Sequence, residues 1–195
     1  MARQLQRKRP APTPSVWIAT ALGKDRPGIV AQVTKILYKL GCNLEDSAMT
    51  RLGGEFAIMV AFSSPATVSR AAIERAFKPL ARLRLVTHLK PLSRDEITAG
   101  AAGSPYLLTV YGADRPGIVY RVSELLAELR VNITDVSTHR TTPSARAASQ
   151  PLYLMLLELE LPKGLATRDV ERHLHKLASE LGVEVSLRSA EASVL

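Results

Sequence analysis

The sequence DRPGIV occupies residues 25–30 and recurs without change at residues 114–119, an offset of 114 − 25 = 89. The same offset relates six further pairs of identical residues: Val33 and Val122, Leu37 and Leu126, Leu40 and Leu129, Asn43 and Asn132, Asp46 and Asp135, and Arg51 and Arg140. A register kept over so many positions indicates an internal duplication, and each copy holds enough apolar residues for its own core. The sequence therefore predicts two similar domains.

Apolar periodicity around each motif alternates between strand and helix patterns. In the first copy the order strand, helix, strand, strand, helix, strand is expected at residues 16–22, 29–40, 43–51, 56–62, 68–80 and 83–89. The last strand is expected to stop before Pro91, because proline cannot donate a hydrogen bond to a sheet. The second copy shows the same periodicities at residues 106–111, 118–129, 157–161, 170–181 and 183–187. Aligning Met59 with Met155 gives an offset of 155 − 59 = 96, so about seven residues are inserted around residues 141–151.

This order of elements predicts an α+β protein made of two tandem ferredoxin-like βαββαβ domains. Each domain is expected to be a four-stranded antiparallel sheet with both helices on one face. We assign the domains to residues 16–90 and 105–190, with a flexible basic arm at 1–15, a linker at 91–104 and a C-terminal tail at 191–195.

Charge is distributed unevenly along the 195 residues. Residues 1–15 carry +4, residues 16–90 carry +6, and residues 91–195 carry −2, which together give the net +8. A basic first domain can pair with the acidic second one or attract a separate acidic partner, and solvated faces of opposite tendency are the alternative. The chain has no long apolar run and a single cysteine, so we expect a protein of the reducing cytoplasm without membrane contact.

The motif places polar and flexible residues at the start of a predicted helix. Asp25 is expected at the helix N-cap, where its carboxylate accepts a hydrogen bond from Gly28, because Pro27 has no N–H. Gly28 allows a close approach, and the free amides of Gly28, Ile29 and Val30, together with the helix dipole, favour a small anion such as a carboxylate. The second copy is expected to form the same site with Asp114, Gly117, Ile118 and Val119.

An asparagine follows the helix in both copies, Asn43 in the first and Asn132 in the second. Its amide oxygen can accept from an ammonium while its NH2 donates to a carboxylate, so helix start and asparagine together can recognise an amino acid. Two repeated aspartates are further candidates for the ammonium or, alternatively, partners of arginines on the same strand: Asp46 with Arg51 and Asp135 with Arg140. A purely structural role for these motifs is the alternative, in which DRPG shapes a tight turn and the asparagine satisfies its own backbone.

DRPGIV between a strand and a helix, followed by GCNL or RVNI, resembles the ACT domain family of small regulatory modules that commonly bind amino acids. Two such units and little else resemble the glycine cleavage system transcriptional repressor group, which regulates through a partner activator. The resemblance implies ligand sites at domain interfaces near Gly28 and Asn43, and near Gly117 and Asn132. It also implies a small amino acid such as glycine as ligand and a regulatory protein as partner. A homodimer and a protein-interaction scaffold with vestigial sites remain open.

Catalytic and metal-binding patterns are weak. His173 and His175 are two residues apart on a predicted helix and point to different sides, which argues against a shared metal. Cys42 aligns with Val131 and is expected to be a small core residue rather than a nucleophile. The sequence contains no phosphate-binding GK[ST] loop, HExxH pair or nucleophile elbow. We therefore expect no enzyme activity, no metal and no cofactor.

Sequence-specific nucleic-acid binding is not expected either. The four cations of the arm would give weak, salt-sensitive phosphate contacts without reading bases. No recognition-helix pattern is present. Formyltetrahydrofolate deformylases also carry the motif, but their activity needs a catalytic domain for which no residues remain.

Overall fold

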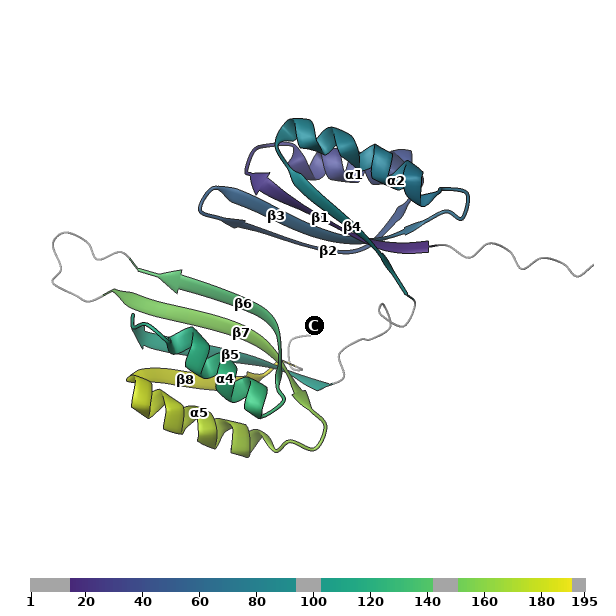
Figure 1. The fold of residues 1–195 in the computed structure, drawn as a ribbon. Coiled ribbons are helices and arrows are strands. Elements are labelled where there is room, and N and C mark those ends of the chain that lie inside the picture. Colours follow the sequence, from purple (N-terminus) through teal and green to yellow (C-terminus); the bar gives the residue numbers. More distant parts are fainter. Residues whose placement is uncertain (1–14, 94–102, 142–150, 191–195) are drawn as a thin grey trace, which may run out of the picture. The chain divides into compact units, whose positions relative to one another are not determined.

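The computed structural model describes residues 15–93, 103–141 and 151–190. Contacts divide the chain into two compact units, residues 1–98 and 99–195, each with its own sheet and helices (Figure 1). The predicted arm apart from Ser15, most of the predicted linker, most of the insertion and the tail lie outside the described residues.

Unit 1 is a four-stranded antiparallel sheet in the order β2-β3-β1-β4, with both helices on one face (Figure 1). Its elements are β1 Ser15–Lys24, α1 Ile29–Lys39, β2 Asn43–Leu52, β3 Glu55–Ser64, α2 Arg70–Phe77, a 3-10 helix η1 Lys78–Leu83, and β4 Val86–Leu92. The first and third strands in chain order are central, so both edges of the sheet are strands with a single neighbour.

Unit 2 repeats this topology in the order β6-β7-β5-β8. Its elements are β5 Gly103–Ala113, α4 Ile118–Glu128, β6 Asn132–Arg140, β7 Leu152–Pro162, α5 Thr167–Leu181 and β8 Val183–Ser189. All three strand pairs are antiparallel, and both helices cover one face of the sheet (Figure 1). The predicted class, α+β with two tandem βαββαβ units, is therefore confirmed.

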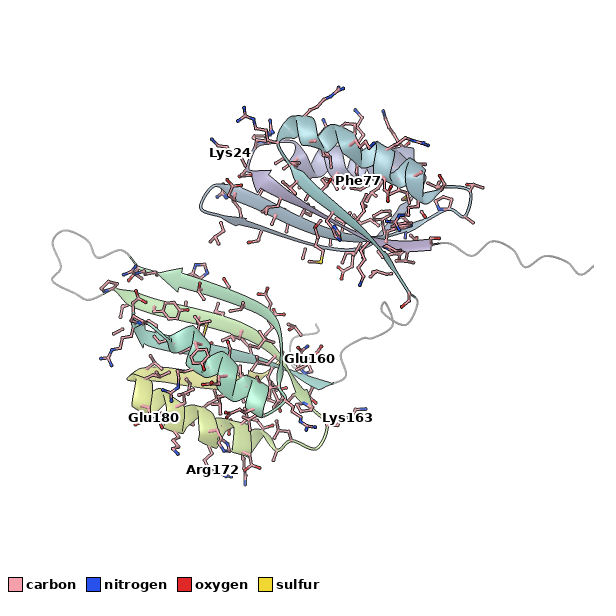
Figure 2. All side chains as sticks on the ribbon, viewed as in Figure 1. Lys24, Phe77, Glu160, Lys163, Arg172 and Glu180 are labelled. Carbon is pink, nitrogen blue, oxygen red and sulfur yellow. The ribbon has the colours of Figure 1, made fainter. Side chains whose placement is uncertain are left out.

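Each unit has its own hydrophobic core between the helices and the sheet. In unit 1 the rings of Phe62 and Phe77 stack with centroids 6.2 Å apart, and Phe77 lies between α2 and the sheet (Figure 2). In unit 2 the fully buried layer includes Leu108, Met155 and Leu174. These side chains come from alternate strand positions and from one helix face, which is the pattern that the sequence predicted.

The predicted last strand of unit 1, residues 83–89, is wrong by three residues. Residues Lys78–Leu83 extend the second helix as a 3-10 turn, and Arg84 adopts a left-handed conformation (φ 57°) before the strand begins. The strand then continues through Pro91, which lies opposite Trp17. Proline is tolerated there because β4 is an edge strand, so its missing N–H can face away from the sheet.

The predicted alignment of the two hairpins is wrong by one residue. Phe56 pairs with Gly23, and Tyr153 pairs with the equivalent Gly112, so the hairpins are offset by 153 − 56 = 97. Met59 is therefore on the outer face, where it is 47% exposed, whereas Met155 is fully buried. A one-residue shift moves a side chain to the opposite face of a strand, and the shared methionine misled the alignment.

Within the residues that the structure describes, no helix is both long and apolar enough to cross a membrane.

Candidate functional site

A groove of about 490 Å³ opens at the start of α1 in unit 1. Four of the five residues predicted for this copy line it: Asp25, Gly28, Ile29 and Val30. The rest of the lining is Arg26, Ala31, Thr34, Met49 and Phe56. The groove therefore joins the β1–α1 turn to the far end of β2 and the beginning of β3.

The backbone of Gly28 sets the geometry of the helix start. Gly28 is the N-cap residue with φ 91° and ψ −3°, and its carbonyl accepts the first helical bond from the Gln32 N–H at 3.0 Å. A Cβ at this position would have no atom within 4 Å, so glycine is required by its positive φ and not by the close approach that the sequence predicted. Gly117 repeats this arrangement with φ 93° and open space in front of it. The first amides of each helix have no intrahelical partner and can donate to a ligand.

Asp25 is not the helix N-cap, which corrects the sequence prediction. The turn through Pro27 places Gly28 at the cap, and no side-chain hydrogen bond caps the helix. The Asp25 carboxylate instead accepts from Arg51 of β2 at 3.5 Å, and the Asp25 N–H donates to the Gly54 carbonyl at 2.9 Å. The repeated aspartate therefore links the end of β1 to the β2–β3 hairpin.

Unit 2 makes the same ion pair with better geometry. Arg140 of β6 donates to the Asp114 carboxylate at 2.7 Å, and the Asp114 N–H donates to the Pro151 carbonyl at 3.1 Å. The repeated arginines thus pair with the aspartates of the motif, not with Asp46 and Asp135. In unit 1 Asp46 accepts from the neighbouring Ser47 N–H at 2.7 Å.

Asn43 lies at the opposite end of the sheet from the helix start. It is the first residue of β2, opposite Ser63, whereas Arg51, opposite Phe56, is at the end near Gly28. Arg51 is eight residue steps along the strand from Asn43, which corresponds to about 27 Å. Asn132 is equally placed at the start of β6, opposite Glu160. Within one unit, the asparagine and the helix start therefore do not meet.

Both asparagines contact a glutamate. The Asn43 NH2 donates to the Glu45 carboxylate at 3.1 Å, and the Asn132 NH2 donates to Glu160 at 3.3 Å (Glu160 is labelled in Figure 2). The Ser63 hydroxyl also donates to Glu45 at 2.6 Å, and the hydrogen bonds from Ser63 and then Asn43 lower the Glu45 pKa. A β-bulge follows each asparagine, at Glu45 and at Thr134. This end of each unit is therefore rich in acceptors and negative charge.

Sequence reasoning missed several residues at the helix start, and the two units differ there. Met49 and Phe56 give the groove of unit 1 an apolar floor, and the equivalent residues of unit 2 are Thr138 and Tyr153. Burial raises the pKa of the Tyr153 hydroxyl. Strand alternation predicts that Phe56 faces inward, but only the register of β2 against β3 shows that Met49 lies beside the helix start.

The other candidate groups are separate from this groove. Cys42 is half-buried and packs against the core of unit 1, as predicted, and burial raises the pKa of its thiol. His173 faces the groove between α4 and α5, whereas His175 faces β8, which confirms that the two point to different sides. Across residues 15–93, 103–141 and 151–190, no three side chains of His, Cys, Asp and Glu gather where they could hold a metal ion.

The profile of the ACT domain matches residues 15–88 and 104–188. The chain belongs to the ACT domain family. Both matched segments begin near the first strand of a unit and end in its last strand, so the two ACT units account for most of the 195 residues.

Three similar proteins cover different lengths of the chain. The glycine cleavage system transcriptional repressor of Escherichia coli is 26% identical over 173 residues, which is 87% of both chains. A UPF0237 protein of Methanopyrus kandleri is 35% identical over 80 residues, 40% of this chain and 80% of that protein. The crystal structure of an unknown protein from Galdieria sulphuraria has a TM-score of 0.79 and 28% identity, and the match covers 91% of this chain and 99% of that one. The E. coli and Galdieria sulphuraria proteins are therefore similar to this chain over most of its length, whereas the Methanopyrus kandleri protein is similar over 40% of it.

Proposed function

We propose that this tandem ACT protein is a non-catalytic cytoplasmic regulator that binds a small amino acid, glycine or a similar one, at interfaces between ACT units. It acts through a partner protein in the transcriptional control of amino-acid metabolism. The observation that carries the proposal is the open groove at the start of α1, where free helix amides adjoin the empty space in front of Gly28.

The two ends of a unit have complementary chemistry for the two ends of an amino acid. The helix start offers N–H donors and the positive end of the helix dipole, which favour a carboxylate. The asparagine end offers amide oxygen and a glutamate carboxylate, Glu45 or Glu160, which favour an ammonium. Because these ends are far apart within one unit, a complete site requires the helix start of one ACT unit and the asparagine end of another.

The link to gene regulation comes from a relative. The E. coli protein that is 26% identical over 87% of both chains is a glycine cleavage system transcriptional repressor. Amino-acid binding that favours one arrangement of the ACT units would change the surface offered to the partner, provided that the ligand's affinity differs between arrangements. Control of glycine cleavage is therefore the form of regulation that we propose.

Calorimetry of the full chain against a panel of amino acids tests this proposal. Glycine has about five heavy atoms, so its binding free energy is limited to about −7.5 kcal/mol and its dissociation constant to no less than about 3 µM. We expect at least one small amino acid to bind with a dissociation constant between this limit and the millimolar range. Asn43→Ala and Asn132→Ala are expected to weaken that binding while folding is retained.

A second pair of variants tests the helix start. Val30 and Val119 are 41% and 44% exposed in the first turn of α1 and α4. Val30→Asp or Val119→Asp adds a carboxylate that the helix dipole stabilises but that repels the ligand's carboxylate. Val30→Asn is the neutral control of nearly equal size. We expect the aspartate variants to lose about tenfold or more in affinity and the asparagine variant to lose little.

Failure of every amino acid to bind at millimolar concentration would contradict the sensor proposal and leave a protein-interaction scaffold. Regulation through a partner protein is tested by measuring DNA binding of the intact and the arm-deleted chain at low and moderate salt. Tight, sequence-selective binding by both forms would contradict regulation through a partner.

A further inference from the structure

A second groove lies between the helices of unit 1, away from the helix start. It has a volume of about 470 Å³. Its floor consists of apolar residues from α1 and its C-cap, from α2 and from η1: Ile36, Leu40, Ala76, Pro79, Leu80 and Leu83. Ile36, Leu40 and Leu83 are only partly buried, so they offer apolar surface to an occupant.

The charged residues that line the rim of this groove are all cations, and the lining also includes the neutral Gln32. Lys35 and Lys39 stand on α1 and Arg82 on η1, and the lining contains no acidic residue. In the helix layer of residues 15–93, Arg70 pairs with Glu74. Among the described residues, no acidic side chain forms an ion pair with any of the three rim cations. The helices α1, α2 and η1 together carry six cations and one acid. Such an excess of one charge next to apolar surface attracts an acidic partner.

Unit 2 serves as an internal comparison because the duplication aligns the helices residue by residue. The offset of 89 carries Lys35 to Glu124 and Lys39 to Glu128, so the charge at both rim positions is reversed. The corresponding groove is smaller, about 230 Å³. Arg121 of α4 donates across this groove to the Glu180 carboxylate of α5 at 2.9 Å. Glu180 and Arg172 are both residues of α5 and are labelled in Figure 2. Unit 2 thus neutralises within itself the surface that unit 1 leaves cationic and open.

We propose that the groove between α1 and α2–η1 of unit 1 docks an acidic amphipathic helix of the partner protein. Apolar side chains at helical spacing would fill the floor, and carboxylates flanking them would pair with Lys35, Lys39 and Arg82. A nucleic-acid backbone matches the cations but leaves the apolar floor uncovered. The inference rests on the proposed function in that it names the surface through which the regulator acts, but it needs no amino acid to be bound.

Fluorescence anisotropy with a synthetic peptide on the full chain tests the docking. The peptide is about 18 residues long, with leucines at i, i+3, i+4 and i+7 and glutamates on the flanks. There are two control peptides. The first has the same composition with scrambled leucine positions, and the second keeps the leucine positions but has lysine in place of glutamate. We expect the acidic amphipathic peptide alone to bind, with an affinity that falls as salt rises from about 50 to 300 mM.

Charge reversal locates the site. Lys35→Glu with Lys39→Glu introduces the residues that the equivalent helix of unit 2 already carries, so the fold is expected to be retained. The matched control is Lys163→Glu with Arg188→Glu, which changes the net charge equally at exposed positions of unit 2. We expect the first pair to weaken the peptide about tenfold or more and the control pair less than about twofold. Equal loss in both pairs would overturn the assignment.

Two other occupants are distinguished by the same variants. The surface would be assigned to a phosphate backbone if the native chain binds a DNA duplex but not the peptide, and if the Lys35/Lys39 variant loses this DNA binding. Salt-sensitive self-association in sedimentation, abolished by this variant alone, would assign it to a second copy of the chain. Amino-acid calorimetry on the native full chain separates the two proposals. Amino-acid binding together with failed peptide binding by the native chain would refute the docking surface alone.

Discussion

Gly28 allows the conformational cost of the motif to be measured without a steric contribution. Its φ of 91° is unfavourable for any residue with a Cβ, but no atom lies within 4 Å of the Cβ position. An alanine in the left-handed region costs about 1–2 kcal/mol, and its restriction of the unfolded chain returns about 0.4–1 kcal/mol. Gly28→Ala is therefore expected to reduce the free energy of unfolding of unit 1 by about 1 kcal/mol.

Urea denaturation followed by tryptophan fluorescence measures this change in unit 1 alone. Trp17 is the single tryptophan of the chain and is only 5% exposed in the core of unit 1. With a urea m-value of about 1.5 kcal/mol per molar, the midpoint should fall by about 0.7 M. Gly28→Asn should lose about half as much, because asparagine tolerates the left-handed region better than alanine.

Gly23→Ala is the contrasting variant. Its Cβ would lie 2.5 Å from the Arg84 carbonyl oxygen, a backbone atom that cannot move away cheaply. We expect it to cost about 2–3 kcal/mol, more than either Gly28 variant. If Gly28→Ala costs as much as Gly23→Ala, or if Gly28→Asn is no milder than Gly28→Ala, then crowding and not backbone conformation explains the glycine of the motif.

Three further predictions concern the core, an ion pair and the cysteine. Phe77→Ala should lower the free energy of unfolding of unit 1 by about 3–5 kcal/mol in the Trp17 assay, because the ring is buried and stacked on Phe62, while Phe77→Leu should cost less than half of this. A double-mutant cycle on Asp114 and Arg140, monitored by circular dichroism, should give a coupling energy of about 0.2–1 kcal/mol that decreases with added salt. The pair is screened by solvent because Arg140 is 66% exposed. A larger coupling energy that does not depend on salt would contradict this. The Cys42 thiol should react with a disulfide reagent more slowly in the native chain than in urea at pH 8, because a raised pKa leaves less thiolate. Equal reaction rates in the native chain and in urea would count against burial of Cys42. The same raised pKa favours folding below the pKa of the unfolded thiol, and this contribution is lost as the pH rises towards the pKa of the folded thiol.

The fold could be predicted from the sequence because the duplication tests each assignment twice. The apolar spacing of Val33 and Leu37 recurs at Val122 and Leu126, and all four are buried. The glycine pair between the strands at 43–51 and 56–62 is typical of a turn, and Gly53 and Gly54 both adopt a positive φ between β2 and β3. Local patterns of this kind depend only on neighbouring residues, so one sequence suffices to detect them.

Relations between distant segments could not be predicted in the same way. The ion pair of Asp25 with Arg51 depends on where β2 ends beside the helix start, which follows from the register of β2 against β3. The separation of Asn43 from Gly28 has the same origin, because a strand that follows a helix begins at the end of the sheet where that helix finishes. Sequence proximity to the motif was therefore a poor guide to the site.

The full exposure of β2 has a consequence for local opening of the domain. Every residue from Asn43 to Leu52 is exposed, and the strand has β3 as its one neighbour in the sheet. Detaching β2 from β3 breaks backbone hydrogen bonds but exposes little buried apolar surface. We therefore expect the free energy of local opening to be lower for β2 than for the core strands of unit 1. Amide hydrogens of β2 should exchange well before those of β1. A slower amide exchange rate in β2 would show, residue by residue, where a molecule binds at the asparagine end of the sheet.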